Sequence, residues 1–364
     1  MMRREAVLAN IKSIPYQSMH DSPTMKYYTS WKLLEESLDE PRGKAEPLIR
    51  NVIPGSSSIE LLPDGGFTGE GEEIRPSPLL FNENEGRIMA AHFLLLNGAL
   101  LLKIAEKEEK RLMILDIAPQ AGSSHHHVRL EMEPGSKGEV VIASSARSSN
   151  GAPMLSFEVL MRDSELRLWK LSRYDDGGLP VSWIRVHASG RSKIDLRSVA
   201  IGGKSNLSSD EVILQGSGES ASIRSFLLAR NGEKVDYITN VINDSPEGKA
   251  EVKVRGFNFG GSVVHRGRLK VAEEAVMSEN VLSSIVYKIS DRARSYSIPS
   301  LEVENSEVLS ASHETSVSPI PEGVLFYLRS RGLSEKEAIE LLVRSSALGV
   351  LEELNAEGII TGLL

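Results

Sequence analysis

The chain has 364 residues, of which 40% are hydrophobic and 25% charged, with a net charge of −8 at pH 7. This composition is typical of a globular protein, and the length suffices for one elongated domain with helical ends or for two domains. The negative charge argues against non-specific nucleic-acid binding, which needs a basic surface. No apolar run approaches the roughly 20 residues of a membrane-spanning helix, and the N-terminus has no apolar signal segment. We therefore expect a cytoplasmic protein with no nucleic-acid and no membrane partner.

Cysteine is absent from the sequence. Its absence excludes disulfides, thiolate nucleophiles and cysteine-ligated metal sites within this chain. The sequence also contains no G-x-x-x-x-G-K-[ST] phosphate loop, no G-x-S-x-G nucleophile elbow and no H-E-x-x-H zinc motif. We therefore expect a non-catalytic protein.

The first 85 residues are expected to form a helical and irregular N-terminal region. Apolar residues lie at helical spacing between Ala6 and Ile11 and again between Trp31 and Leu38. Residues 41–85 are interrupted by many prolines and glycines, a pattern typical of an irregular connector with short strands.

Residues 86–316 carry an almost continuous β pattern. Short apolar or alternating runs recur about every 10–15 residues between Gly, Asn, Asp and Ser turns, without helical patterns that would indicate βαβ units. The pattern alone leaves a sandwich, a barrel and a β-helix open, because no clean repeat separates them. The runs are Leu112–Ile117, Gly138–Ala143, Leu155–Leu160, Leu166–Trp169, Ser182–Val186, Lys193–Ile201, Val212–Leu214, Ile223–Leu228, Tyr237–Val241, Ala250–Val254 and Ser262–Val271.

The segment from Ser297 onward passes from strands into helices. Two short strands are predicted on either side of a turn at Glu304–Glu307. Pro321 then opens a run with helical spacing, and Gly332 stands where a helix-ending C′ glycine would. Ser334 and Glu337 form an S-x-x-E capping box for a second helix, expected to run from Glu335 to about Leu354. Residues 317–364 are therefore expected to be a C-terminal helical subdomain.

Motifs in this C-terminal part carry a family resemblance. They are S-I-P-x-L-E-V at Ser297–Val303, A-S-H-x-x-x-V at Ala311–Val317 and L-F-Y-L-R-S-R-G at Leu325–Gly332, with weaker matches at Val235–Asp236 and Val263–Gly267. With these motifs the chain resembles, over about residues 230–345, the SufB/SufD family of iron–sulfur cluster assembly scaffolds, which work with the SufC ATPase. The resemblance implies a right-handed parallel β-helix core with helical terminal regions, hence a mainly β fold.

The resemblance also implies partners and a cargo. SufB-type members supply a cysteine thiolate to the nascent cluster, whereas SufD-type members contribute a histidine, so a cysteine-free chain resembles the SufD type. Such a chain would pair with a SufB-type chain, or with a second copy of itself as a homodimer. A transient iron–sulfur cluster would be shared with that partner, and none would be bound tightly by this chain alone.

His313 is the first candidate site residue. A neutral imidazole can ligate iron, and His313 matches the histidine of the family's A-S-H motif. The alternative is a structural histidine with satisfied hydrogen bonds. Glu314 follows where the family usually continues H-G-A-T; it would add an oxygen ligand, although adjacent strand residues face opposite ways.

Two other positions are considered as ligands. His125 and His127 would point the same way on a strand and could share a metal ion, the alternative being a solvated strand edge or loop. Asn243 stands where the family commonly has another histidine, and amides are poorer ligands. Asp236 is expected to make a core hydrogen bond or serve a turn.

The last candidate is a partner-binding helix. Phe326, Tyr327, Arg329 and Arg331 combine aromatic and guanidinium groups, a composition favoured at interface hot spots. By resemblance this helix would dock the SufC ATPase. The alternative for Phe326 is packing on the end of the β core.

Two other functions remain open on the sequence. A β-helix carbohydrate-active or sugar-binding protein is one, although only 5% of the residues are aromatic and such proteins use aromatic stacking platforms. The other is a homo-oligomeric relative that keeps the fold without a role in cluster assembly.

Overall fold

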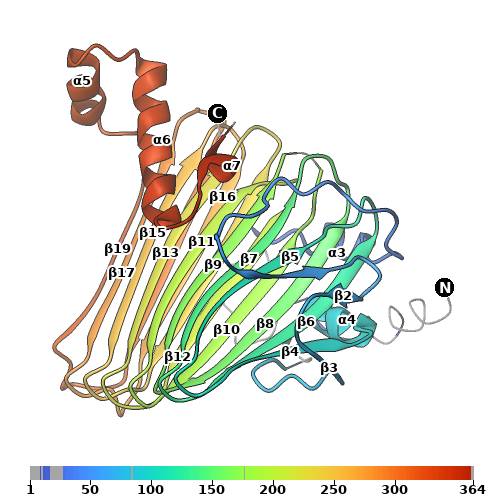
Figure 1. Ribbon diagram of the computed structural model, residues 1–364. Helices are drawn as coiled ribbons and strands as arrows, with labels where there is room; N and C mark the ends of the chain where they lie inside the picture. The colour runs from blue at the N-terminus through green and yellow to red at the C-terminus, as the bar shows by residue number, and fades with distance from the viewer. Residues whose placement is uncertain (1–8, 10, 17–27, 83–84, 176, 362–364) are drawn as a thin grey trace.

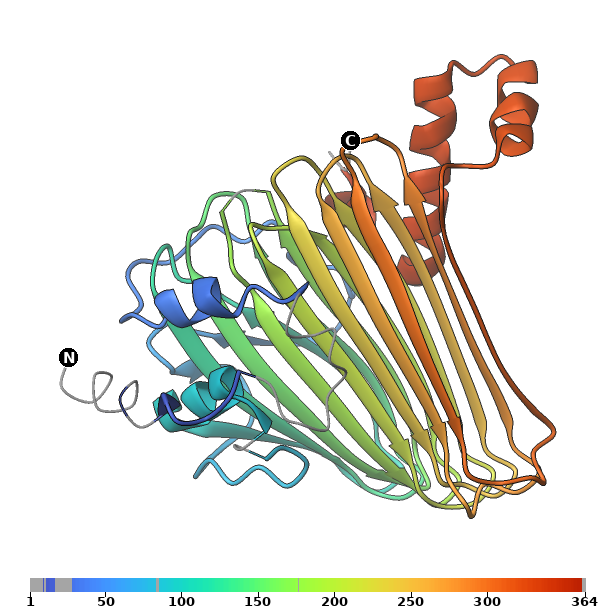
Figure 2. The same ribbon diagram turned by 180° about the vertical axis from the view of Figure 1, so that it is seen from behind.

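The fold is a parallel β-solenoid, seen from two sides in Figures 1 and 2. In this computed structural model the described residues are 9, 11–16, 28–82, 85–175 and 177–361. From β4 onward successive strands alternate between two sheets, and each of them up to β17 pairs in parallel with the strand two places further along the chain, as β9 does with β11. At the other end β2 and β3 pair antiparallel with β1 and β4. The expected β-helix core is therefore confirmed. The helix expected from Ala6 falls almost wholly outside the described residues.

The two sheets contain ten and nine strands. The first comprises β1 (Ser57–Leu61), β2 (Phe67–Thr68), β5 (Glu109–Asp116), β7 (Lys137–Ala146), β9 (Glu165–Tyr174), β11 (Lys193–Gly202), β13 (Ser220–Ala229), β15 (Lys249–Asn258), β17 (Glu279–Lys288) and β19 (Ser310–Ser318). The second comprises β3 (Glu72–Ile74), β4 (Ala99–Ile104), β6 (Ser123–Met132), β8 (Ala152–Arg162), β10 (Val181–Ser189), β12 (Asn206–Leu214), β14 (Lys234–Asn243), β16 (Ser262–Val271) and β18 (Arg294–Val303).

The core is built from side chains that stack in rows along the solenoid. Leu168, Leu196 and Ile223 occupy the same position on neighbouring strands and are fully buried between the sheets. Each turn brings the chain back after about 28 residues, and alternation along a strand sends every second side chain inward. Such rows need apolar residues in register but no repeated sequence. The sequence therefore predicts strands but does not show the spacing of about 28 residues between turns.

Helices lie against the outer faces at both ends. α3 (Trp31–Glu36) and α4 (Arg87–Leu95) pack at the N-terminal end of the nine-stranded sheet (Figure 2). The β pattern expected from residue 86 onward does not hold for α4, a short helix with six of its nine residues buried. Ile88, Met89, Ala90, Ala91, His92 and Leu95 are its buried residues. A helix buried on most sides has no amphipathic pattern to find.

The C-terminal helices match the signals in the sequence. α5 (Glu322–Ser330) follows Pro321, and Gly332 has φ +96° in the left-handed region. α6 (Glu335–Leu351) begins with the complete Ser334–Glu337 capping box and ends earlier than expected, before the short α7 (Glu357–Ile360). We call the α5–α6 hairpin the arm; it protrudes from the C-terminal end of the solenoid (Figure 1). Among the described residues no helix is long and apolar enough to cross a membrane.

Candidate functional site

The C-terminal end of the solenoid is open. β18 and β19 are the last strands of their sheets, and each has one described neighbour, β16 and β17 respectively. The strongest family motifs fall here, with Ser297–Val303 in β18 and Ala311–Val317 in β19. We call these two strands the open end. An unpaired strand edge offers backbone N–H and C=O groups to another chain.

His313 stands at the end of a core row. It pairs in register with Leu282, which pairs with Val252, and both of these residues are fully buried. His313 itself is exposed because no further turn covers it. An imidazole therefore ends an aliphatic row at an exposed strand.

Glu314 lies on the opposite face of β19. It is in register with Ser283 and, further along, with Lys253, which belongs to the outer surface of the sheet. Adjacent strand residues point to opposite faces, so Glu314 and His313 do not share a site within this chain.

A buried polar strip leads through the core to the open end. His265 lies between Thr239 Oγ1 at 3.0 Å and Ser284 Oγ at 2.9 Å, and Ser284 Oγ accepts from Ser297 Oγ at 2.9 Å. Burial lowers the pKa of His265 to about 3, with the neighbouring Arg266 charge acting in the same direction, so the ring is neutral at pH 7. The strip thus ends at Ser297 in β18, with neutral hydrogen-bonding groups behind it.

Deeper in the core the polar groups include a buried ion pair. Lys170 donates to Asp210, which also accepts hydrogen bonds from Ser198 Oγ at 2.5 Å and Tyr237 Oη at 2.6 Å. The ring of Tyr237 stacks on His265 with 5.7 Å between centroids. The sequence did not predict this buried polar strip, because an isolated polar residue in an alternating strand also fits a strand with one solvated face.

The histidines of β6 are buried, which corrects the alternative of a solvated edge or loop. His125 and His127 face α4, where His92 Nδ1 lies 3.2 Å from His125 Nδ1 and His92 Nε2 lies 2.9 Å from Ser156 Oγ. His127 contacts Ser156 Oγ at 2.8 Å and Glu158 Oε1 at 3.3 Å, and His125 Nε2 contacts Ser123 Oγ at 3.0 Å.

This cluster has the properties of satisfied core histidines. Every ring nitrogen of His92, His125 and His127 has a hydrogen-bonding neighbour, which leaves no lone pair directed at a metal. Burial, reinforced by the other rings, holds the pKa of His92 well below its usual range. Burial alone would raise the pKa of Glu158, but hydrogen bonds from His127, Leu80 N–H and Arg129 outweigh it and lower the pKa to about 2. No group of three or more potential metal ligands occurs among the described residues.

The side chains of Asn243 and Asp236 are both buried and form hydrogen bonds inside the protein. Asn243 Nδ2 donates to Asn280 Oδ1 at 2.7 Å, and both residues are fully buried. Asp236 pairs with Arg266 and accepts a hydrogen bond from Thr29 Oγ1 at 2.6 Å. The two weaker family motifs, Val235–Asp236 and Val263–Gly267, therefore meet in one buried ion pair on neighbouring strands.

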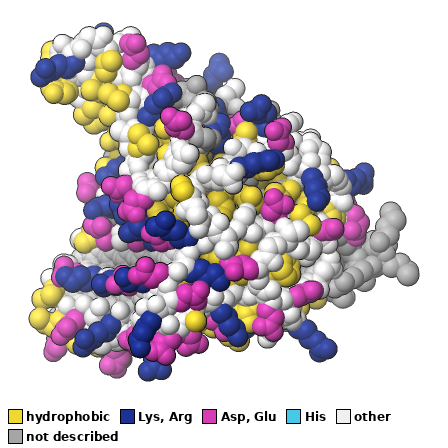
Figure 3. Space-filling view, in the orientation of Figure 1, with side chains coloured by type: hydrophobic (Ala, Val, Ile, Leu, Met, Phe, Trp, Pro, Cys, Tyr) yellow, Lys and Arg dark blue, Asp and Glu magenta, His cyan; other side chains and the backbone are white. Residues whose placement is uncertain are grey.

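The arm exposes an apolar surface. Phe326 is 74% and Tyr327 58% exposed, and none of the residues of α5 is buried. Phe326 therefore does not pack on the end of the β core, contrary to that alternative. Arg331 lies over the ring of Tyr327, 5.4 Å from its centroid, and Arg329 is 3.9 Å from Glu335. Figure 3 shows hydrophobic side chains gathered on this protruding part at upper left.

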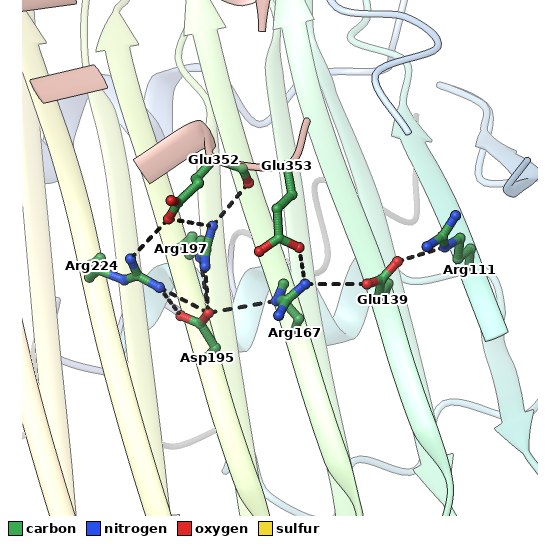
Figure 4. Close-up of polar contacts among 8 residues, drawn as sticks. All are labelled: Arg111, Glu139, Arg167, Asp195, Arg197, Arg224, Glu352 and Glu353. Atoms are coloured by element: carbon green, nitrogen blue, oxygen red, sulfur yellow. Dashed lines mark hydrogen bonds and ion pairs between the residues drawn. The ribbon is translucent and has the colours of Figure 1, made fainter. Parts of the chain in front are cut away.

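The base of the arm is fixed to the ten-stranded sheet by ion pairs (Figure 4). Arg197 Nη1 donates to the backbone oxygen of Glu352 at 2.9 Å, Arg224 lies 3.6 Å from the Glu352 carboxylate, and Arg167 pairs with Glu353. Asp195 forms ion pairs with Arg167 and Arg224. Beside these pairs, Val343 and Ala347 of α6 pack into the apolar outer layer of the sheet. These contacts join the segment after α6 to β9, β11 and β13.

Together these features define a β-solenoid protein with two edge strands at its C-terminal end and a protruding helical arm. The sequence model of the SUF system FeS cluster assembly SufBD core domain matches residues 116–346. The chain therefore belongs to the SufBD family.

Several relatives are similar over part of the chain. An iron-sulfur cluster assembly SufBD family protein of Synechocystis sp. is 29% identical over 167 residues, which are 46% of this chain and 35% of the relative. A SufBD family protein of Staphylococcus saprophyticus is 30% identical over 158 residues, 43% of this chain and 33% of the relative. The matched segments thus span about a third of each relative's length. Family membership favours the scaffold over the carbohydrate-binding alternative.

Proposed function

We propose that this chain is a SufD-type scaffold subunit of iron–sulfur cluster assembly, without catalytic turnover of its own. The observation that carries the proposal is the position of His313, which ends a buried core row at an exposed edge. A second β-solenoid joined edge to edge would extend both sheets by backbone pairing and enclose His313 at the junction.

The cluster in this proposal is cargo that the junction assembles and releases. This chain supplies one imidazole and no thiolate, so the remaining ligands come from the partner. A SufB-type chain with a cysteine at its matching edge meets this need. A second copy of this chain fits the same edges but brings only histidine, which favours the heterodimer for cluster assembly.

The arm is the proposed contact for a SufC-type ATPase. Its exposed aromatic rings and the guanidinium groups of Arg329 and Arg331 have the composition of a binding hot spot. Closure of the ATPase would pull on α6, and the Glu352 and Glu353 contacts would pass that pull to the sheet. Opening of the junction to iron and sulfide would follow from this movement.

Phe326→Ala is expected to weaken binding of the SufC-type ATPase by about 2 kcal/mol, or roughly thirtyfold in Kd, because the most exposed ring of the arm is lost. The thermal midpoint should stay within the range of surface substitutions, since the ring makes no core contact. Isothermal titration calorimetry with the ATPase measures the change. The matched control is Leu79→Ala, which removes an apolar side chain that is 58% exposed and lies outside the arm. Equal affinities of Phe326→Ala and the wild type would remove α5 from the proposal.

A further inference from the structure

Three Asn–Gly pairs occur in the sequence, at Asn97–Gly98, Asn150–Gly151 and Asn231–Gly232. In such a pair the glycine nitrogen can attack the side-chain amide of the asparagine, because glycine has no side chain to crowd the approach. The reaction requires both groups to move toward each other. Hydrogen bonds to either group, or packing around them, therefore slow it. The three pairs differ in this respect in the folded protein.

Asn231 and Gly232 form the tip of the turn between β13 and β14. Both residues are exposed, and Gly232 has φ +85°, in the left-handed region. The Glu233 N–H donates to Arg230 O at 3.0 Å and closes the turn beneath them. Among the described residues, neither the Asn231 side chain nor the Gly232 N–H has a hydrogen-bond partner. Apart from the adjoining residues, no described atom lies within 4 Å of the position that a Cβ on Gly232 would take.

The other two pairs are held by hydrogen bonds. Asn97 Nδ2 donates to Asp64 O at 3.3 Å, so the amide that would be attacked is restrained. The Gly151 N–H donates to Ser149 Oγ at 2.9 Å, and Gly151 is buried, so the attacking nitrogen of that pair is restrained instead. Within the described part of the chain, Asn231–Gly232 is thus the one Asn–Gly pair with both reacting groups free.

We propose that Asn231 deamidates spontaneously in the folded protein. The Gly232 nitrogen bonds to Asn231 Cγ while the bond from Cγ to the side-chain nitrogen breaks, and the proton of the Gly232 nitrogen leaves with the ammonia. The product is a five-membered succinimide ring, which water then opens. Water that breaks the new Cγ–N bond leaves an aspartate, whereas water that breaks the original peptide bond leaves an isoaspartate.

The reaction adds a carboxylate to a turn whose anchors lie outside the reacting pair. The Phe259 N–H donates to Ala229 O at 2.8 Å and the Lys234 N–H to Gly203 O at 3.1 Å, so neighbouring corners of the solenoid hold both sides of the turn. We therefore expect the converted protein to keep its fold while it becomes more acidic. Neither the open end nor the arm takes part, so the inference is independent of the proposed scaffold function.

The test incubates the intact protein in mildly alkaline buffer and follows the three asparagines by peptide mass spectrometry, with electron-transfer fragmentation to separate aspartate from isoaspartate. Asn231 is expected to convert at least about fivefold faster than Asn97 or Asn150, because in those pairs one hydrogen bond must break first. In guanidinium chloride, where the fold is lost, the three rates should converge, since each pair is then an exposed dipeptide.

Two variants test the assignment by isoelectric focusing. Asn231→Gln keeps a neutral amide at this exposed position but would have to close a larger ring, so the acidic species that the wild type develops should be lost. Asn150→Gln is the matched control and should develop that species at the rate of the wild type. The proposal is overturned if Asn231 in the folded protein converts no faster than Asn97 or Asn150, or if Asn231→Gln becomes acidic as the wild type does.

Discussion

Asp236→Asn is expected to lower the free energy of unfolding by about 3–5 kcal/mol, because it leaves the Arg266 guanidinium buried without a counter-charge. The side chains of Arg266 and Asp236 are 5% and 1% exposed, so water cannot replace the lost carboxylate. The change also removes an acceptor for Thr29 Oγ1, the contact that holds the chain before α3 on the sheet. Urea unfolding followed by far-ultraviolet circular dichroism measures the loss.

The matched control is Glu302→Gln on the same side of the solenoid. Its partner Arg268 lies two residues from Arg266 on β16, but the side chains of this pair are 41% and 43% exposed. Water screens such a pair, and its loss should cost no more than about 1 kcal/mol. Similar losses in both variants would contradict the claim that burial of the Asp236–Arg266 pair governs its contribution.

The stability of the protein is expected to fall as the pH drops below about 6.5. The pKa of His265 is about 3 in the folded protein, so below an ordinary histidine value of about 6.5 the unfolded chain binds the extra proton more readily. Stability is therefore fully present above pH 6.5 and declines toward pH 3. At pH 4.5 the two pH units below 6.5 correspond to about 2–3 kcal/mol. His92, whose pKa is also lowered, adds to the loss in the same direction.

Replacing the ring tests this assignment. His265→Gln keeps hydrogen-bonding groups for Thr239 and Ser284 but cannot titrate, so the difference in unfolding free energy between pH 7 and pH 4.5 should shrink by about 2–3 kcal/mol. His187→Gln, at the surface beside Gln215, should keep the pH dependence of the wild type. An unchanged pH dependence in His265→Gln would show that the buried ring is not the acid-sensitive group.

The sequence predicted most strands of the solenoid, although no run marked β4, β6 or β17, and it predicted their arrangement only through family resemblance. Alternating runs such as Lys193–Ile201 identify strands because a side chain's face depends on its own neighbours in the chain. Which strands pair depends on residues about 28 positions apart, as with Leu168 and Leu196, and those positions share only apolar character. Helix α4 was missed because its surroundings, rather than its pattern, made it a buried helix.

The residues of the candidate site also fall into two groups, those predicted from local sequence and those that depend on the packing of distant segments. The Ser334–Glu337 box and Gly332 were predicted correctly because caps are local chemistry. The His92 ring beside His125, and the meeting of Asp236 with Arg266, required the packing of distant segments. His313 was found by its motif, but its place at the end of a core row, with Glu314 facing away, emerged only from the register of β17 and β19.

The most direct test of the scaffold proposal is anaerobic co-purification of the chain with SufB-type and SufC-type proteins from the same source. Wild type, His313→Ala and Glu314→Ala are compared, and iron and sulfide per complex are counted after reconstitution. The account predicts that all three form the complex and that only His313→Ala retains clearly less cluster, since Glu314 lies on the other face of β19. Equal iron and sulfide in His313→Ala, or failure of the wild type to form the complex, would contradict it.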